Sequence, residues 1–287
     1  MCGLAALLDG KTVVFPAPFE LMSRSEVSEV SHATILRMSK CLVIANWKMN
    51  PPTFREAKLL LEATKKSAEK ANVSLVVAPP SLFLRELRRL SRSRRILFAA
   101  QHAHFEEGGA HTGEISIQQV RDAKAGYVLI GHAERRARGE TNDDTRQKVG
   151  AALANGLIPV LCVGETKRTA SGDYFPLIAE QIRVAFTDVP AIKLGKVVIV
   201  YEPLWTIGTD KTMDPRSMHE MSIFIRKTIV DSYGQEGHKM KILYGGSIDA
   251  TNAGAMLQDG DVHGLLVGRA SINAVEFAHL LQAVGNS

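Results

Sequence analysis

The 287-residue chain has few cysteines and lacks the long apolar runs of membrane-spanning helices. Its apolar stretches are all shorter than the roughly 18 residues needed to cross a bilayer, so we expect no membrane association. Cys2, Cys41 and Cys162 are widely spaced and form neither a C-x-x-C pair nor a disulfide framework. This pattern is typical of a reducing compartment and predicts a cytoplasmic protein. Cys162 lies within an apolar run, where we expect it to be a small buried residue.

The chain also lacks a strong charge of either sign, with a formal net charge of +5. One basic stretch, Leu84–Arg95, is a candidate contact for RNA or an acidic partner. It has no interleaved aromatic residues and no nucleic-acid-binding motif, so a solvated helix face with cations near its C-terminus explains it better. We therefore expect no nucleic-acid partner. The small positive excess suits an anionic small molecule instead.

Short apolar runs recur along the chain and alternate with longer amphipathic stretches. The runs are rich in Val, Ile and Leu and do not alternate strictly with polar residues, which is typical of parallel strands buried on both faces. Eight such runs predict eight strands. They are Cys41–Ala45, Ser74–Ala78, Ile96–Ala100, Tyr127–Ile130, Ile158–Val163, Val197–Tyr201, Ile242–Tyr244 and Gly264–Val267.

The stretches between these runs carry helix signals. Thr53–Glu56 has the form of a capping box, and an apolar stripe at helical spacing follows it. Asp214 and Pro215 supply an N-cap and a first-turn proline, and Met218, Met221, Ile225 and Ile229 continue as a buried stripe. Eight strand–helix units without an obvious linker predict a (β/α)₈ TIM barrel.

The barrel is expected to occupy residues 38–287 as a single domain. Residues 1–37 have neither a secretory nor a transit-peptide layout, and Met38 directly precedes the first apolar run. We expect residues 1–37 to be a loosely ordered extension or the product of too early a start codon.

Three reactive side chains each follow a predicted strand. Lys48 follows the first, His132 the fourth and Glu202 the sixth. Taken singly, each has a structural explanation: a solvated lysine, a hydrogen-bonded histidine, a carboxylate that ends a strand. In a closed barrel, however, the carboxyl ends of all strands open into one mouth, so their joint placement predicts a catalytic site.

Glycine-rich segments follow the last three predicted strands. They are Ile207–Thr209, Gly245–Ser247 and Gly268–Ser271. Glycine pairs often mark only tight turns. Exposed backbone N–H groups also bind phosphate, and barrels often hold phosphate beyond strands seven and eight, so the position favours a phosphate site.

These segments together resemble triosephosphate isomerases, and the resemblance runs from Met38 to the C-terminus in family order. The Asn-Trp-Lys-Met-Asn and Tyr-Glu-Pro-x-Trp-x-Ile-Gly-Thr segments are the most specific. The matching pieces are Asn46–Asn50, Gln101, Thr112–Glu114, Gly131–Arg136, Gly139–Thr141, Cys162–Thr166, Tyr201–Thr209, Tyr244–Ser247 and Leu266–Ser271.

The resemblance implies an isomerase of glycolysis and gluconeogenesis that interconverts dihydroxyacetone phosphate and D-glyceraldehyde 3-phosphate. Glu202 would be the base that removes a carbon-bound proton. His132, held neutral, would polarise the carbonyl and move protons between the two oxygens. Lys48 would place a positive charge near the enediolate and the phosphate, and Asn46 would donate a hydrogen bond nearby. Proton transfer alone needs no cofactor and no metal, and the sequence has no His/Cys ligand cluster or nucleotide fingerprint.

The resemblance also implies the surroundings of the reaction. Gly208, in a mobile lid over 203–211, would bind the phosphate together with Ser247, Gly268 and the backbone of Arg269. Glu134 would support the lysine without touching the substrate. The loop around Thr112 would insert into a second copy of the chain, which predicts a homodimer.

Three positions depart from the commonest family pattern. Ala133 stands in place of serine, Arg269 in place of glycine in the last phosphate loop, and Asp210 in place of glycine in the lid. None removes a catalytic group, so the departures bear on rate more than on reaction. Two alternatives stay open: an isomerase of a longer keto-sugar phosphate, or a non-catalytic relative that binds a phosphate ligand.

Overall fold

The computed structural model describes residues 6–8, 11–13, 41–71, 73–91, 93, 95–169, 171–206 and 211–286, the first two ranges by their backbone alone. The chain divides into two units, residues 1–37 and residues 38–287. The first contains a two-stranded antiparallel pair of β1 (Ala6–Leu8) and β2 (Lys11–Val13). The sequence analysis named no strand in this part of the chain. The β-branched pair Thr12-Val13 favours extended backbone and was overlooked. The expected loose order of residues 1–37 concerns residues that are mostly outside the described ranges, and it stays a prediction.

The second unit contains a closed barrel of eight parallel strands, in the order β10-β3-β4-β5-β6-β7-β8-β9. All eight predicted strands are confirmed, with bounds shifted by at most one residue. They are β3 (Leu42–Asn46), β4 (Ser74–Ala78), β5 (Ile96–Ala100), β6 (Tyr127–Ile130), β7 (Ile158–Val163), β8 (Val198–Tyr201), β9 (Lys241–Tyr244) and β10 (Gly264–Val267).

The strands are buried on both faces because side chains alternate between two apolar layers. In β3, Leu42 and Ile44 belong to the layer inside the barrel. Val43 and Ala45 belong to the larger layer between the strands and the helices. This two-sided burial explains why the predicted strands read as continuous apolar runs.

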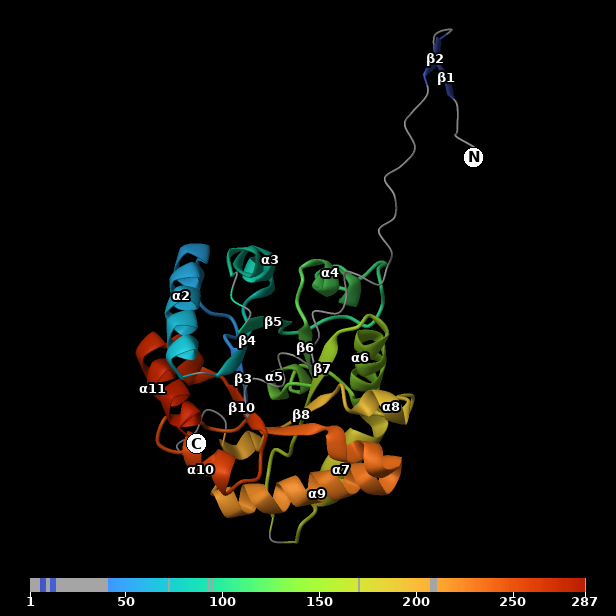
Figure 1. Ribbon diagram of the computed structural model, residues 1–287. Coiled ribbons are helices and arrows are strands. Elements are labelled where there is room, and N and C mark those ends of the chain that lie inside the picture. Colours follow the sequence, from blue (N-terminus) through green and yellow to red (C-terminus); the bar gives the residue numbers. More distant parts are fainter. Residues whose placement is uncertain are drawn as a thin grey trace. The chain divides into compact units, whose positions relative to one another are not determined.

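Helices surround the strands on the outside, with the strands in the middle of Figure 1. Apolar stripes face the barrel, as in α9, where Met218, Met221, Ile225 and Ile229 are fully buried. The helices are α2 (Phe54–Ala71), α3 (Ser81–Leu90), α4 (Ile117–Asp122), α5 (Ala133–Arg136), α6 (Asn142–Ala154), α7 (Tyr174–Ala185), α8 (Ala191–Leu194), α9 (Pro215–Tyr233), α10 (Ala253–Gln258) and α11 (Ala274–Gly285). Three 3₁₀ turns complete them: η1 (Leu204–Thr206), η2 (Gly234–Lys239) and η3 (Arg269–Ile272).

The predicted helix starts are confirmed by hydrogen bonds. The N–H of Glu56 donates to Oγ1 of Thr53 over 3.3 Å at the start of α2. The N–H of Ser217 donates to Oδ1 of Asp214 over 2.9 Å at the start of α9, where Pro215 is the first helical residue. These bonds satisfy backbone donors that the first helical turn leaves without a partner.

The first part of the basic stretch, up to Leu90, lies in a helix with one apolar face, as expected, whereas Arg92 and Arg94 lie outside the described residues. In α3, Leu84 and Leu87 are buried, while Arg85 forms an ion pair with Asp122 at 3.0 Å. Arg88 and Arg89 lie in the last turn, where cations stabilise the helix dipole. Among the described residues, no helix is both long and apolar enough to span a membrane.

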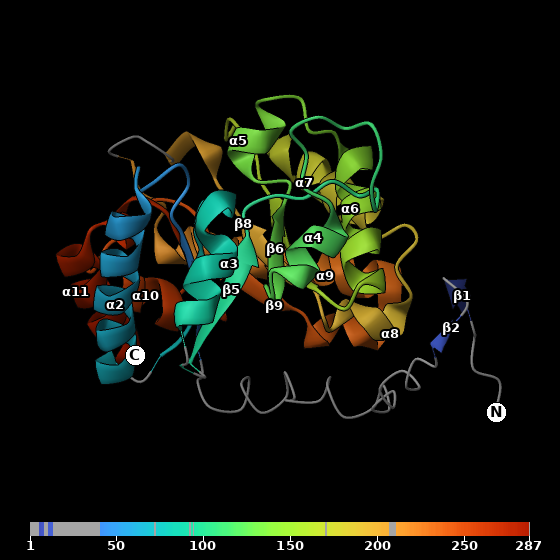
Figure 2. The same ribbon diagram turned by 90° about the horizontal axis from the view of Figure 1, so that it is seen from above.

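The carboxyl ends of the strands all lie on one side of the barrel, because the strands are parallel. Figure 2 shows this side at its upper edge, where the short helix α5 follows β6 directly. Every reactive residue singled out in the sequence follows a strand, so this rim is where they meet.

Candidate active site

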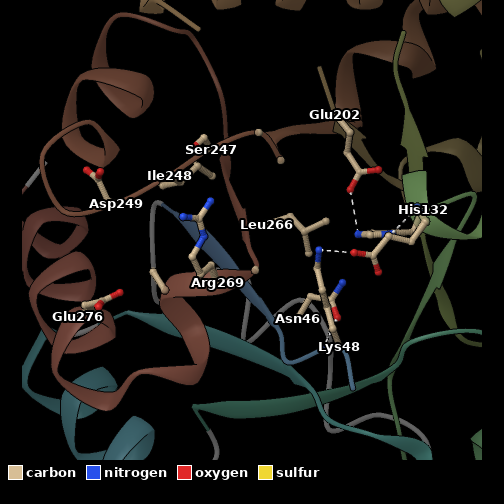
Figure 3. Close-up of a pocket in the computed structure, with 15 residues that line it drawn as sticks. Asn46, Lys48, His132, Glu202, Ser247, Ile248, Asp249, Leu266, Arg269 and Glu276 are labelled. Carbon is tan, nitrogen blue, oxygen red and sulfur yellow. Dashed lines mark hydrogen bonds and ion pairs between the residues drawn. The ribbon is translucent and has the colours of Figure 1, made fainter. Parts of the chain in front are cut away.

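A cavity of about 520 Å³ opens at the carboxyl ends of the strands. Its walls include all four predicted catalytic residues, Asn46, Lys48, His132 and Glu202. Figure 3 shows the last three directed into the same space from different strands. The cavity is also lined by Glu134 and by the predicted phosphate-binding residues Ser247, Gly268 and Arg269. Gly208, the remaining predicted site residue, lies outside the described residues.

Glu202 directly follows β8, and its side chain is 2% exposed. Its Oε2 accepts a hydrogen bond of 2.9 Å from the backbone N–H of Ala133, and its Oε1 lies 3.3 Å from Nε2 of His132. The backbone around it is tightly packed, since a Cβ added at Gly164 would lie 1.9 Å from the carbonyl oxygen of Glu202. The carboxylate is therefore held in a defined place at the bottom of the cavity, with little contact to water.

His132 precedes α5 and acts as its N-cap. Its Nδ1 accepts a hydrogen bond of 3.2 Å from the backbone N–H of Glu134. A ring nitrogen that accepts a backbone N–H carries no proton, so the hydrogen of the neutral ring is on Nε2. That hydrogen points toward Glu202 and the cavity (Figure 3). The backbone N–H of Glu134, in the first turn of α5, thus selects the tautomer of His132 that is protonated on Nε2.

Lys48 follows β3 with a φ of 53°, a left-handed conformation that is uncommon outside glycine. Three contacts hold it there. Its N–H donates to Oδ1 of Asn46 at 3.0 Å, its carbonyl accepts from Nε2 of Gln101 at 2.8 Å, and its Nζ donates to Oε1 of Glu134 at 2.6 Å. Asn46 and Gln101 therefore aim the ammonium group into the cavity.

Glu134 is the ion-pair partner of Lys48, in agreement with the supporting role that the resemblance implies. Partial burial acts to raise the pKa of Glu134, but the hydrogen bond and charge of Lys48 outweigh it, and the pKa is lowered overall. The carboxylate is therefore ionised and orients the ammonium. Both side chains are partly exposed, so water screens much of the attraction.

The two described glycine-rich loops form one wall of the cavity. Gly246 must be a glycine, since a Cβ there would lie 2.2 Å from the hydroxyl of Tyr244. The hydroxyl of Ser271 donates to the carbonyl of Gly268 at 2.7 Å and lies 3.4 Å from the carbonyl oxygen of Asn46. This hydroxyl ties the last loop to the end of β3. Both loops are thus closely packed, and their residues line the cavity.

The sequence analysis assigned no role to Glu165, although it also follows a predicted strand. Its Oε1 accepts hydrogen bonds from the hydroxyl of Tyr201 at 2.8 Å and from Nε1 of Trp205 at 3.0 Å. Burial raises the pKa of Glu165, and these two bonds only partly oppose the rise. Trp205 lies at the start of the predicted lid, so this buried carboxylate anchors the base of that segment. Glu202 was identified because it follows a predicted strand, and the same criterion would have identified Glu165.

Cys162 is fully buried inside the barrel, as predicted. Burial, reinforced by the nearby charge of Glu202, raises the pKa of its thiol well above the usual value. It is therefore a packed thiol and not a nucleophile. Within the part of the chain that the structure describes, no group of three or more His, Cys, Asp or Glu side chains is arranged to hold a metal ion.

Known proteins resemble this chain over most of its length. The sequence model of the family described as Triosephosphate isomerase matches residues 41–284. The triosephosphate isomerase of Endomicrobium trichonymphae is 38% identical over 248 residues, which cover 85% of this chain and 99% of that protein. The triosephosphate isomerase of Lactiplantibacillus plantarum is 37% identical over 249 residues, covering 85% and 98%, and that of Alkaliphilus oremlandii is 36% identical over 247 residues, covering 85% and 99%. This chain belongs to the triosephosphate isomerase family.

Proposed function

We propose that this chain interconverts dihydroxyacetone phosphate and D-glyceraldehyde 3-phosphate by proton transfer through an enediolate. The observation that carries the proposal is the meeting of Glu202, His132 and Lys48 in one cavity that two glycine-rich loops also line. A base, a hydrogen-bond donor and a cation are what such a proton transfer requires. The reaction belongs to glycolysis and gluconeogenesis. Family membership does not favour the two alternatives, a longer keto-sugar phosphate or a non-catalytic relative.

Glu202 is the base in this scheme. Its carboxylate turns from the N–H of Ala133 toward the substrate and takes the proton from the carbon next to the carbonyl group. The electron pair of that C–H bond forms the carbon–carbon double bond of the enediolate, and the carbonyl oxygen becomes negatively charged. Glu202 then returns its proton to the neighbouring carbon, which completes the isomerisation with no net gain or loss of protons.

His132 and Lys48 stabilise the charge that develops on oxygen. The Nε2–H of His132 donates to the carbonyl oxygen and passes a proton between the two substrate oxygens. The Lys48 ammonium attracts the enediolate, and the Asn46 amide donates a further hydrogen bond nearby. Glu202 and His132 are buried, so water screens the interactions of these two groups less than it would in solution.

The phosphate group is held by backbone N–H groups of Ser247, Gly268 and Arg269 in this proposal. In the described conformation the N–H of Ser247 is directed to Oγ1 of Thr206 at 3.4 Å, a long bond that a phosphate oxygen can replace. Gly208 closes over the phosphate from the lid, although it lies outside the described residues. Lid closure would exclude water and keep the enediolate from losing its phosphate.

We further propose that the chain is a cytoplasmic homodimer in which the loop around Thr112 inserts into the partner. The loop projects from the barrel: Thr112 is exposed, and the ring of His104 stacks on Phe105 and His111 at 4.4 and 4.3 Å. Met49, which is 92% exposed, and Leu82, which is 91% exposed, are apolar side chains that a partner would cover.

Sedimentation tests the dimer. The protein should sediment as a dimer, and Met49→Glu with Leu82→Glu should shift it to the monomer. Ile223→Glu, at a half-exposed position in α9, should leave the dimer intact. A monomeric unmodified protein would contradict the proposal.

A coupled assay of glyceraldehyde 3-phosphate isomerisation tests the reaction, with Glu202→Gln beside the unmodified protein. We expect rapid conversion that falls by roughly 10²–10⁴-fold in the variant, the range for loss of a general base. The matched control is Glu220→Gln, which makes the same change at an exposed carboxylate of α9 outside the cavity and should alter turnover less than about two-fold. A near-normal rate in Glu202→Gln would overturn the assignment of the base.

A further inference from the structure

Arg269 stands in the last phosphate loop, where the family resemblance leads us to expect glycine. The structure resolves where its side chain lies. Arg269 lines the active-site cavity, and Figure 3 shows its guanidinium group directed toward the loop that carries Ser247 and Ile248. The side chain therefore reaches across the cavity mouth between the two glycine-rich loops. It does not turn away toward the outer helices.

The guanidinium group has no hydrogen bond or ion pair with any residue that the structure describes. Two carboxylates, Asp249 and Glu276, line the same cavity, but each has local hydrogen-bond donors and neither forms an ion pair with Arg269. Asp249 accepts three hydrogen bonds, two from Thr251 and one from Asn252. Glu276 accepts one from Nδ2 of Asn273 at 2.8 Å. The five N–H donors of Arg269 are thus available to a ligand.

The charge balance of the cavity shows why such a cation matters. Four carboxylates line it, those of Glu134, Glu202, Asp249 and Glu276, against the two cations Lys48 and Arg269. The Lys48 ammonium is already paired with Glu134 at 2.6 Å. A phosphate dianion that enters the cavity therefore meets an excess of negative charge, and Arg269 is the cation that can offset it.

Both cations belong to the surroundings of one glycine-rich loop. A Cβ added at Gly268 would be 3.4 Å from Cε and 3.9 Å from Nζ of Lys48, so Lys48 borders the loop immediately before Arg269. A phosphate bound to the backbone of this loop would therefore lie near both the ammonium and the guanidinium.

We propose that the Arg269 side chain binds the substrate phosphate directly and strengthens the binding of the phosphorylated substrate beyond what the backbone donors provide. The guanidinium donates two charge-assisted hydrogen bonds to phosphate oxygens, in addition to the backbone N–H groups. The phosphate does not change during the reaction, so this contact is equally strong in the bound substrate and in the transition state. It therefore lowers KM and leaves kcat nearly unchanged. The inference rests on the proposed isomerase function.

Kinetics of Arg269→Ala test the proposal. KM for glyceraldehyde 3-phosphate and the inhibition constant of inorganic phosphate should both rise about ten-fold, equivalent to about 1.4 kcal/mol, while kcat stays within about two-fold. Arg269→Lys, which keeps the charge but loses the paired donors, should give a smaller rise. Arg216→Ala is the control for net charge, because Arg216 is exposed in α9 and does not line the cavity.

Three further results separate this role from others. Activity on unphosphorylated glyceraldehyde should be the same with and without Arg269, and an equal loss on both substrates would overturn the proposal in favour of a structural role. Unchanged KM and phosphate inhibition in Arg269→Ala would overturn it as well.

Calorimetric titration with inorganic phosphate measures binding without turnover. If the unmodified protein failed to isomerise but bound phosphate more tightly than Arg269→Ala, the isomerase function would fail and the phosphate contact would stand.

Discussion

The Nε2 atom of His132 lies 3.3 Å from Oε1 of Glu202, and the next residue, Ala133, donates its backbone N–H to the other carboxylate oxygen. The proposed base and the proposed proton carrier are thus held against each other before substrate arrives. Substrate binding must replace these contacts, so the donor of His132 and the lone pairs of Glu202 become available in the same step. The two residues come from different strands, β8 and β6, and their carboxyl ends bring them together.

Replacing His132 with glutamine should lower kcat by roughly 10²–10⁴-fold, the range for loss of an acid–base group. Glutamine can still donate a hydrogen bond, but it cannot pass a proton between the two oxygens of the enediolate. The coupled assay measures the loss, and thermal unfolding checks that the barrel remains intact. A variant with normal kcat would show that the histidine only fills space.

Replacing Lys48 with alanine should lower kcat/KM by on the order of 10³-fold, with KM raised and kcat reduced, because the charge acts on both the phosphate and the enediolate. The companion variant is Glu134→Gln, which keeps an acceptor for the Nζ atom but removes the carboxylate charge. We expect its loss to stay within about ten-fold. If Lys48→Ala altered only the unfolding free energy, Lys48 would be structural.

The Glu165 site predicts a pH dependence of stability. Burial raises the pKa of Glu165 in the folded protein above that of the unfolded chain, despite the bonds from Tyr201 and Trp205. The folded protein is therefore favoured while this group is protonated, and that advantage is lost as pH rises through the folded-state pKa. Glu165→Gln cannot ionise and escapes the loss.

The difference in unfolding free energy, Glu165→Gln minus unmodified protein, should consequently become more positive as pH rises above 4.5, the ordinary pKa of a glutamate, and should level off above the raised folded-state pKa of Glu165. Urea unfolding at several pH values measures it. Glu220→Gln, at an exposed position in α9, should give a nearly constant difference. A constant difference for Glu165→Gln would mean that its pKa is not raised.

Two glycines allow a paired test of packing around the site. A Cβ at Gly164 would lie 1.9 Å from the carbonyl oxygen of Glu202. A backbone atom can move away from such a clash only at a large cost in folding free energy. Gly164→Ala should therefore destabilise the protein by about 3 kcal/mol and reduce turnover by displacing Glu202. A Cβ at Gly150, inside α6, meets no atom within 4 Å.

Gly150→Ala should accordingly stabilise the protein by about 0.5–1 kcal/mol and leave turnover unchanged, since alanine favours helix more than glycine does. Chemical unfolding of both variants measures the pair. Equal effects of the two substitutions would contradict the packing argument at Gly164.

The strands and the main helices could be predicted because their signals are local. The apolar runs match the eight strands to within a residue, since strands buried on both faces must be apolar throughout. The cap at Asp214 and the stripe from Met218 to Ile229 identified α9 for the same reason, since each depends on residues within a few turns of one another. The β1–β2 pair was missed because its strands are only three residues long.

In the candidate site, too, some features could be predicted from the sequence and others came only from the tertiary structure. The residue types and their positions after strands were sufficient to select Lys48, His132 and Glu202, together with the glycine-rich loops. Three features came only from the tertiary structure: the tautomer of His132, the buried Glu165–Trp205 contact, and the direction of the Arg269 side chain. Each of these depends on distances between groups or on local backbone direction. A linear sequence specifies the chemistry that each strand end carries, but only closure of the barrel sets the distances and burial that determine which groups pair and which stay free for a ligand.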